Sequence, residues 1–246
     1  MPLIFGDRLD THKLATGHYG YSATRLNQLG AAEYTLVTIV CDVSPSVNNF
    51  RAEMERAIKQ IVLSCQYSPR ADNLLVRLMT FDTYVYEHHG YKLLQNCRQA
   101  DYDGILNGKG GTALFDASEN AIAATVHYGT QLAGGSMAVN AIVFVITDGE
   151  DNSSKQTAKA VKAVLDKAKA AESLETLFTV LIGVNVNDVK IARYLQNFYY
   201  EAGFTQYIEL DNANAATLAR LADFVSRSIS SQSQALGGGV GKALTF

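Results

Sequence analysis

Three short segments of this 246-residue chain carry hydroxyl and carboxylate side chains at positions where they could bind a metal ion. The first segment holds Asp42, Ser44 and Ser46 at alternate positions, and two glycines precede Thr112 in the second. The third segment is a Thr-Asp-Gly sequence that contains Asp148. Oxygen atoms are the ligands that Mg²⁺ prefers, and alternate residues of an extended loop can face one point. These five residues are therefore predicted to bind a divalent cation, with Mg²⁺ expected and Mn²⁺ or Ca²⁺ as alternatives.

Each segment lies next to an element that a buried parallel sheet would contain. Residues 34–42 and 141–147 are nearly continuous β-branched and apolar runs, which are typical of strands buried on both faces. An alanine-rich helix is expected to begin at Thr112 and to run to about Tyr128. Ligands of such sheets bind beyond the carboxyl ends of the strands, so the three segments are expected to meet at one edge.

Strand and helix patterns alternate along the rest of the chain. The other expected strands are residues 74–81, a short edge strand at 84–88, 177–184 and 206–210. The other expected helices are one that Asn48 or Asn49 could cap and that ends near Cys65, and residues 156–171, 188–202 and 215–229. This order predicts a doubly wound α/β fold, with a mostly parallel central sheet and helices on both faces.

Composition divides the chain into three parts. Residues 1–30 have no clear period and are expected to be an extension that packs on the domain or on a partner. Residues 31–230 form the α/β domain, and residues 231–246 are expected to be a flexible tail rich in Gly and Ser. The tail contains Gly-Gly-Val-Gly-Lys at 238–242. It lacks the first glycine of a nucleotide-binding loop, and Ala243 stands where that loop needs Ser or Thr.

The charge balance and the cysteines restrict the class of protein. A net charge of −3 gives no basic excess for binding nucleic acid or an anionic membrane. Three cysteines without paired spacing argue against a disulfide framework and favour a reducing compartment. We expect the cytoplasm, because neither a signal peptide nor an apolar run of membrane-spanning length, about 18 residues, is found.

Taken together and in this order, the three segments resemble the metal-ion-dependent adhesion site of the von Willebrand factor A domain family. That site combines Asp-x-Ser-x-Ser, a distant Thr and an Asp in a Thr-Asp-Gly turn. The resemblance covers about residues 34–230 and implies the doubly wound fold. It implies that the two serines and the threonine contact the metal, and that the two aspartates bind it directly or through water. Pro45 and Val47 depart from the residues that are frequent in the family, but neither change removes a ligand.

The resemblance implies a binding module and not an enzyme: a Glu or Asp of a partner protein would complete the metal's coordination shell. Cytosolic relatives often work beside AAA+ ATPases or in stress-response assemblies, so a partner of that kind is expected. One alternative is a Mg²⁺-dependent phosphatase with Asp42 as nucleophile. Such enzymes usually place a second Asp two residues later as general acid, where this chain has Ser44. Another alternative is a structural subunit of a larger complex. Asp116 and Glu150 lie near the site in sequence and are not expected to be ligands.

Overall fold

The computed structural model describes residues 9–15, 19–171, 173–235 and 244–246, and its strands form one sheet. The strands are β1 (Leu9–His12), β2 (Tyr21–Thr24), β3 (Glu33–Asp42), β4 (Leu74–Phe81), β5 (Val85–Leu93), β6 (Ala138–Thr147), β7 (Thr176–Val184) and β8 (Gln206–Leu210). Their order in the eight-stranded sheet is β1-β2-β5-β4-β3-β6-β7-β8. The consecutive strands β4, β3, β6, β7 and β8 are parallel, whereas β5 pairs antiparallel with β4.

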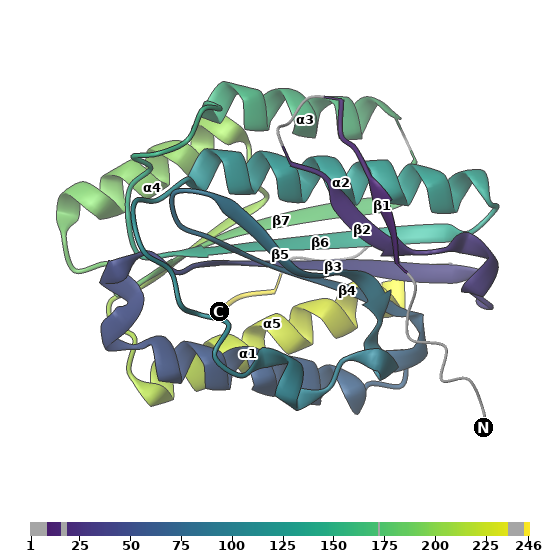
Figure 1. Ribbon diagram of the computed structural model, residues 1–246, viewed down its shortest axis with the longest axis horizontal. Coiled ribbons are helices and arrows are strands. Elements are labelled where there is room, and N and C mark those ends of the chain that lie inside the picture. Colours follow the sequence, from purple (N-terminus) through teal and green to yellow (C-terminus); the bar gives the residue numbers. More distant parts are fainter. Residues whose placement is uncertain (1–8, 16–18, 172, 236–243) are drawn as a thin grey trace.

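Helices cover both faces of this sheet, as Figure 1 shows. On one face lie α1 (Arg51–Gln66) and α5 (Ala215–Ala235), which pack against each other. On the other face lie α2 (Leu114–Gly134), α3 (Ala158–Ala171) and α4 (Val189–Ala202). The predicted doubly wound α/β fold with a mostly parallel sheet is therefore confirmed.

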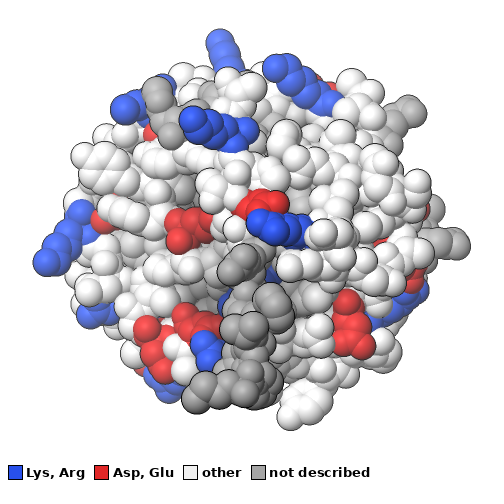
Figure 2. Space-filling model, turned by 45° about the vertical axis from the view of Figure 1, so that its right-hand side comes forward, with Lys and Arg blue, Asp and Glu red and all other residues white. Residues whose placement is uncertain are grey.

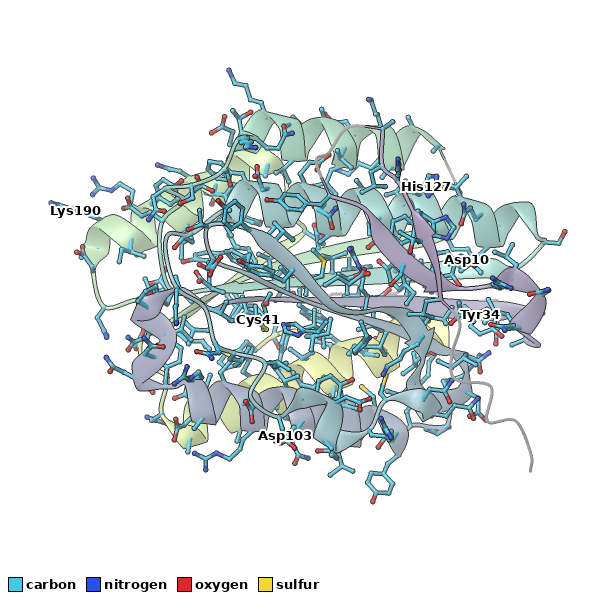
Figure 3. All side chains as sticks on the ribbon, viewed as in Figure 1. Asp10, Tyr34, Cys41, Asp103, His127 and Lys190 are labelled. Atoms are coloured by element: carbon cyan, nitrogen blue, oxygen red, sulfur yellow. The ribbon has the colours of Figure 1, made fainter. Side chains whose placement is uncertain are left out.

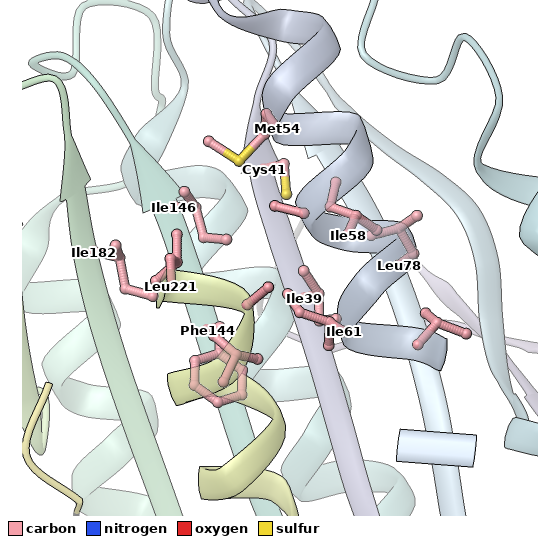
Figure 4. Close-up of a cluster of buried hydrophobic side chains, with 14 of the residues drawn as sticks. Ile39, Cys41, Met54, Ile58, Ile61, Leu78, Phe144, Ile146, Ile182 and Leu221 are labelled. Carbon is pink, nitrogen blue, oxygen red and sulfur yellow. The ribbon is translucent and has the colours of Figure 1, made fainter. Parts of the chain in front are cut away.

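The central strand β3 is buried from both sides, which explains its nearly continuous apolar sequence. Ile39 and Cys41 lie in the cluster beneath α1 and α5, together with Met54 and Ile58 of α1 (Figure 4). Val40, whose side chain points the opposite way, belongs to the cluster beneath the other three helices. A strand with a core on each face needs apolar residues at successive positions and not at alternate ones.

Two sequence predictions about local structure were wrong. The edge strand expected at 84–88 is the nine-residue β5, and it lies inside the sheet because β2 pairs with its outer side. Neither Asn48 nor Asn49 caps α1, because both belong to a 3-10 turn over Pro45–Asn49 and the helix begins afterwards. Proline restricts φ at the first position of that turn, which favours the tight turn over an immediate helix start.

β1 pairs antiparallel with β2 along its length, whereas the contact of β2 with β5 includes several side-chain hydrogen bonds. β2 and β5 share a single register pair, Ala23 with Tyr91. The backbone N–H of Ser22 donates to both carboxylate oxygens of Glu87, at 3.2 and 3.0 Å, and the Ser22 hydroxyl donates to the same carboxylate at 2.7 Å. The hydroxyl of Tyr128 donates to the backbone oxygen of Thr24 at 2.6 Å. Part of the predicted extension therefore completes the sheet.

At the other end, α5 continues to Ala235, beyond its predicted end at residue 229. Residues 236–243 of the predicted flexible tail lie outside the described residues. The last three residues contact the domain. The backbone oxygen of Leu244 accepts a hydrogen bond from Gln206 at 2.9 Å, and the Phe246 ring packs edge-on against Phe224. Among the described residues, no helix combines the length and the apolar character needed to cross a membrane.

Candidate metal centre

The predicted ligands lie at the carboxyl edge of the sheet. Cys41 of β3 pairs with Ile146 of β6, so the next residues, Asp42 and Thr147, are neighbours at the ends of the two strands. The Thr147 hydroxyl donates a hydrogen bond to Oδ2 of Asp42 at 2.6 Å. In Figure 3 this edge lies at the end of the molecule where Lys190 marks the start of α4, opposite Tyr34 at the start of β3.

A continuous set of hydrogen bonds links four of the five predicted ligands. The backbone N–H of Ser44 donates to Oδ1 of Asp42 at 2.8 Å, which folds the chain back over the carboxylate. The hydroxyls of Ser44 and Ser46 lie 3.0 Å apart, and the Ser46 hydroxyl donates to Oδ1 of Asp148 at 2.8 Å. The alternate spacing of these side chains therefore brings them together as the sequence predicts.

Thr112 lies at the same edge but makes no direct hydrogen bond to those four residues within the described part of the chain. Its loop is held by the β4–β5 turn: the Asp82 backbone oxygen accepts from Ala113 at 2.6 Å, and the Thr83 hydroxyl accepts from Gly111 at 2.8 Å. Gly110 has φ of 130°, a conformation that favours glycine. Thr112 is 5% exposed, and among the described residues its hydrogen bonds are those of its backbone, not of its hydroxyl.

The site concentrates negative charge that no basic side chain balances. Asp42 and Asp148 are buried, and among the described residues neither forms an ion pair. Burial raises the pKa of Asp42 to about 6, although hydrogen bonds from Thr147 and Ser44 oppose the rise. Burial also raises the pKa of Asp148, against the hydrogen bond from Ser46. A bound cation would offset the cost of burying these two carboxylates in their ionised form.

The donor set fits a hard divalent ion better than a soft one. It consists of carboxylate and hydroxyl oxygens, which suit Mg²⁺, Ca²⁺ or Mn²⁺. Across the described ranges, no three or more His, Cys, Asp or Glu side chains gather in a way that could hold a metal. Any metal here must therefore depend on the hydroxyls of Ser44, Ser46 and Thr112 in addition to the aspartates.

Three further residues of this edge, Thr147, Asp82 and Asn152, were not predicted from the sequence to belong to the site. Asp82 follows β4, the neighbour of β3, and its carboxylate accepts from the backbone N–H groups of Tyr84 and Lys109 at 3.0 and 2.9 Å. Asn152 accepts from the backbone N–H of Thr112 at 2.7 Å. A polar residue directly after a strand was the available signal for Asp82, whereas no local pattern marks Asn152 as a partner of Thr112.

Comparison with known proteins identifies the family to which this fold belongs. The sequence model of the von Willebrand factor type A domain matches residues 37–226, and the chain belongs to this family. Members of the family are generally metal-dependent modules for protein–protein interaction. No curated protein is a significant match to the chain.

Several solved structures share the fold at low sequence identity. Proximal thread matrix protein 1 of the mussel byssus has a TM-score of 0.56 at 20% identity, over 81% of this chain and 47% of that one. A form of that protein with zinc in its MIDAS (metal-ion-dependent adhesion site) motif gives 0.55 at 20% identity, over 82% and 47%. The PilB minor pilin of Streptococcus sanguinis gives 0.57 at 14% identity, over 81% and 62%. The chain thus spans about half the length of the mussel protein.

Proposed function

We propose that this protein captures a partner protein through a divalent cation held by Asp42, Ser44, Ser46, Thr112 and Asp148. The observation that carries the proposal is a pair of buried carboxylates that have no ion pair among the described residues and that hydrogen bonds join through Ser44 and Ser46 at the carboxyl edge of the sheet. A divalent cation would supply the missing positive charge. Three of its five donors in this chain, the hydroxyls of Ser44, Ser46 and Thr112, would be neutral. This donor set favours one further anionic oxygen from outside.

A carboxylate from an Asp or Glu of the partner is the expected outside ligand. The bound metal supplies a strong electrostatic attraction for that carboxylate. The chain's own residues fix the position of the binding point, because the hydrogen bonds of Ser44 and Ser46 hold the two aspartates in place. Mg²⁺ is the expected ion, with Mn²⁺ or Ca²⁺ as alternatives, because oxygen donors accept all three.

Binding is favoured over catalysis. A phosphatase that used Asp42 as nucleophile would need a general acid close by. The residue two positions later, Ser44, has its hydroxyl within hydrogen-bond distance of Ser46 and cannot supply that acid. The family membership also supports an interaction module.

The surface and the cysteines bear on the partner and the compartment. On the face in Figure 2, acidic and basic side chains are interspersed among neutral ones, without a continuous basic patch suited to nucleic acid. All three cysteines are buried and free, which is compatible with a reducing cytoplasm. We therefore propose a protein partner, such as an AAA+ ATPase or a stress-response assembly.

The direct test uses thermal melting followed by peptide selection. The melting temperature of the full chain is measured in EDTA, Mg²⁺, Mn²⁺ and Ca²⁺, alongside Asp42→Ala. An ion that binds only the folded state must stabilise it, so a rise that is absent from the variant is expected. The metal-loaded chain then selects from a random peptide library. Enrichment of Asp or Glu that EDTA abolishes supports the proposal; peptide capture that is unchanged by EDTA contradicts it.

A further inference from the structure

The loop after β6 and the start of α2 hold each other through reciprocal hydrogen bonds. The side-chain oxygen of Asn152 accepts from the backbone N–H of Thr112 at 2.7 Å. In return, the backbone oxygen of Thr112 accepts from the N–H groups of Asn152 and Ser153, at 3.0 and 3.2 Å. Both backbone polar groups of Thr112 are therefore fixed by this one loop.

A second set of bonds extends the contact along the first turn of α2. The Asp151 carboxylate accepts from the N–H of Phe115 at 3.0 Å, and the Ser154 hydroxyl accepts from the N–H of Asp116 at 2.9 Å. The Asp116 carboxylate accepts in turn from the N–H groups of Lys155 and Gln156, at 3.0 and 2.7 Å. Asp116 is 4% exposed, so these bonds satisfy a buried carboxylate.

These bonds replace an ordinary helix cap. The first N–H groups of a helix have no partner within the helix, and a side chain of the N-cap residue usually supplies one. The N-cap position of α2 is Ala113, which cannot do so. The residues that cap α2 instead come from the loop that also carries Asp148, so capping of the helix and placement of the two metal ligands depend on the same contacts.

The contact leaves the functional atom of Thr112 free. Its backbone is held on both sides, while its hydroxyl has no hydrogen bond among the described residues. Close packing strengthens the arrangement: a Cβ added at Gly111 would lie 2.0 Å from the Ser153 hydroxyl and 2.4 Å from Oδ1 of Asn152. The absence of a side chain at residue 111 is what allows the loop to approach Thr112.

We infer that Asn152 is a positioning residue for the metal centre, and that residues 151–154 hold Thr112 at a set place relative to Asp148. This inference rests on the proposed metal site. Asn152 acts through the backbone of Thr112 and is not itself a ligand. Its removal leaves all five ligand side chains present but allows one of them to move, which lowers metal affinity without deleting a donor.

The test is a Mn²⁺ titration of the full chain, followed by electron paramagnetic resonance of the free ion. Partners of metal ligands typically contribute a 10–100-fold effect on affinity, so Asn152→Ala is expected to weaken Mn²⁺ binding by roughly that factor. Asn152→Asp keeps an acceptor for the Thr112 N–H and is expected to bind within a few-fold of wild type. Gly111→Ala, which forces the loop away, is expected to weaken binding as Asn152→Ala does.

The matched control is Asn214→Ala. Asn214 accepts from the N–H of Thr217 at 2.9 Å at the start of α5, so it caps a helix on the opposite face of the sheet from α2. Its loss is expected to lower the metal-free melting temperature about as much as Asn152→Ala does, while Mn²⁺ affinity is retained. Wild-type affinity in Asn152→Ala overturns the positioning role. So does equal weakening by Asn214→Ala, or weakening by Asn152→Asp as large as that by Asn152→Ala.

The outcome for the wild-type chain separates this inference from the proposed function. If wild type binds Mn²⁺ and Asn152→Ala binds it equally well, the positioning role fails and the metal site stands. If wild type does not bind Mn²⁺ and Asp42→Ala behaves identically, the metal site fails and the inference fails with it. Thermal melting of every variant without metal checks whether each one folds.

Discussion

Ser46 donates a hydrogen bond to Asp148 across 2.8 Å, although 102 positions separate the two residues in the chain. This bond joins the loop after β3 to the loop after β6 and so holds two of the predicted ligands near each other. Such preorganisation reduces the conformational entropy that a ligand would otherwise have to offset on binding. The same bond shows why the order of the three sequence segments matters, since only adjacent parallel strands place these loops together.

Thr112→Val tests the hydroxyl alone. Valine is close in shape to threonine, and the hydroxyl that it removes has no hydrogen bond among the described residues. The metal-free melting temperature is therefore expected to stay within a few degrees of wild type. Stabilisation by Mg²⁺ is expected to disappear in Thr112→Val and to persist in Thr112→Ser, as differential scanning fluorimetry would measure. Equal stabilisation of all three proteins would remove Thr112 from the ligand set.

Asp42→Asn is expected to stabilise the metal-free protein while it abolishes the response to metal. Burial raises the pKa of Asp42 to about 6, so holding it ionised at pH 7.5 is unfavourable. Neutral asparagine removes that cost, and the free energy of unfolding in EDTA is expected to rise by about 1–3 kcal/mol. Urea denaturation measures the change. The exposed Asp223→Asn serves as control and should shift it little. A destabilised Asp42→Asn protein in EDTA would contradict the electrostatic argument.

The folded protein is expected to lose stability in acid because of the buried ring of His89. Burial lowers its pKa to about 4, while Nε2 lies 3.1 Å from the Tyr102 hydroxyl. Between pH 6.5 and about 4 the unfolded chain takes up a proton at this residue and the folded chain does not. Stability is therefore lost as pH falls through that window. In His89→Gln the free energy of unfolding should fall less steeply between pH 7 and pH 4. His12 and His88, whose pKa values are also lowered by burial, remain in both proteins.

Parallel pH curves for the wild type and His89→Gln would contradict that assignment. The comparison removes the contribution of carboxylates elsewhere, because these groups are identical in the two chains. It also keeps the measurement away from the metal centre, so EDTA can be present throughout.

The ion pairs Arg77–Glu87 and Arg25–Asp10 allow the contact of a buried arginine to be compared with that of an exposed one. It is fully buried in β4, where Nε contacts Glu87 at 2.7 Å and Nη2 donates to Asn120 at 2.9 Å. Arg77→Met removes the cationic partner of Glu87, and it leaves the side-chain oxygen of the buried Asn120 without its donor. A loss of roughly 3–5 kcal/mol in the free energy of unfolding is expected. Arg25→Met, which breaks the exposed pair with Asp10, is expected to lose about 1 kcal/mol or less. Similar losses in the two variants, measured by urea denaturation, would contradict the role of burial.

Gly90→Ala tests how β2 is attached. A Cβ at residue 90 would lie 1.9 Å from the backbone oxygen of Ser22, so β2 must move away from β5. Limited proteolysis is expected to cleave the segment before residue 30 faster in this variant than in wild type. Gly134→Ala is the control, because an added Cβ there meets nothing within 4 Å. Unchanged cleavage of Gly90→Ala would show that β2 tolerates the shift.

The fold could be predicted from the sequence because its central strands β3, β4, β6 and β7 are buried on both faces along all or most of their length. Such strands carry long apolar runs, and β3 and β6 are visible by that signal alone. β1 and β2 were missed for the opposite reason. Each has four residues, and β2 depends on contacts such as that of Ser22 with Glu87, 65 positions away. No local pattern can report a bond of that range.

The candidate site, like the fold, could be predicted from the sequence only in part. The types and spacing of Asp42, Ser44 and Ser46 predicted a convergence that the structure shows as a set of hydrogen bonds. The tie between Thr112 and Asn152 could not be predicted, since it depends on how the loop after β6 lies against α2. The sequence predicted the candidate ligands, and tertiary packing determined which neighbours hold them.

The outermost strands of the sheet are short, and this affects how readily two molecules could pair edge to edge. β1 has four residues and contains Asp10, whose carboxylate pairs with Arg25, and β8 on the opposite edge has five. Long flat edge strands recruit further strands from other molecules and lead to aggregation. Here the strands from β5 to β7 have eight to ten residues, and the sheet ends in the four-residue β1 on one side and the five-residue β8 on the other. A second molecule therefore finds little backbone to pair with along β1 and β8, which lowers the tendency of this apolar sheet to recruit further strands.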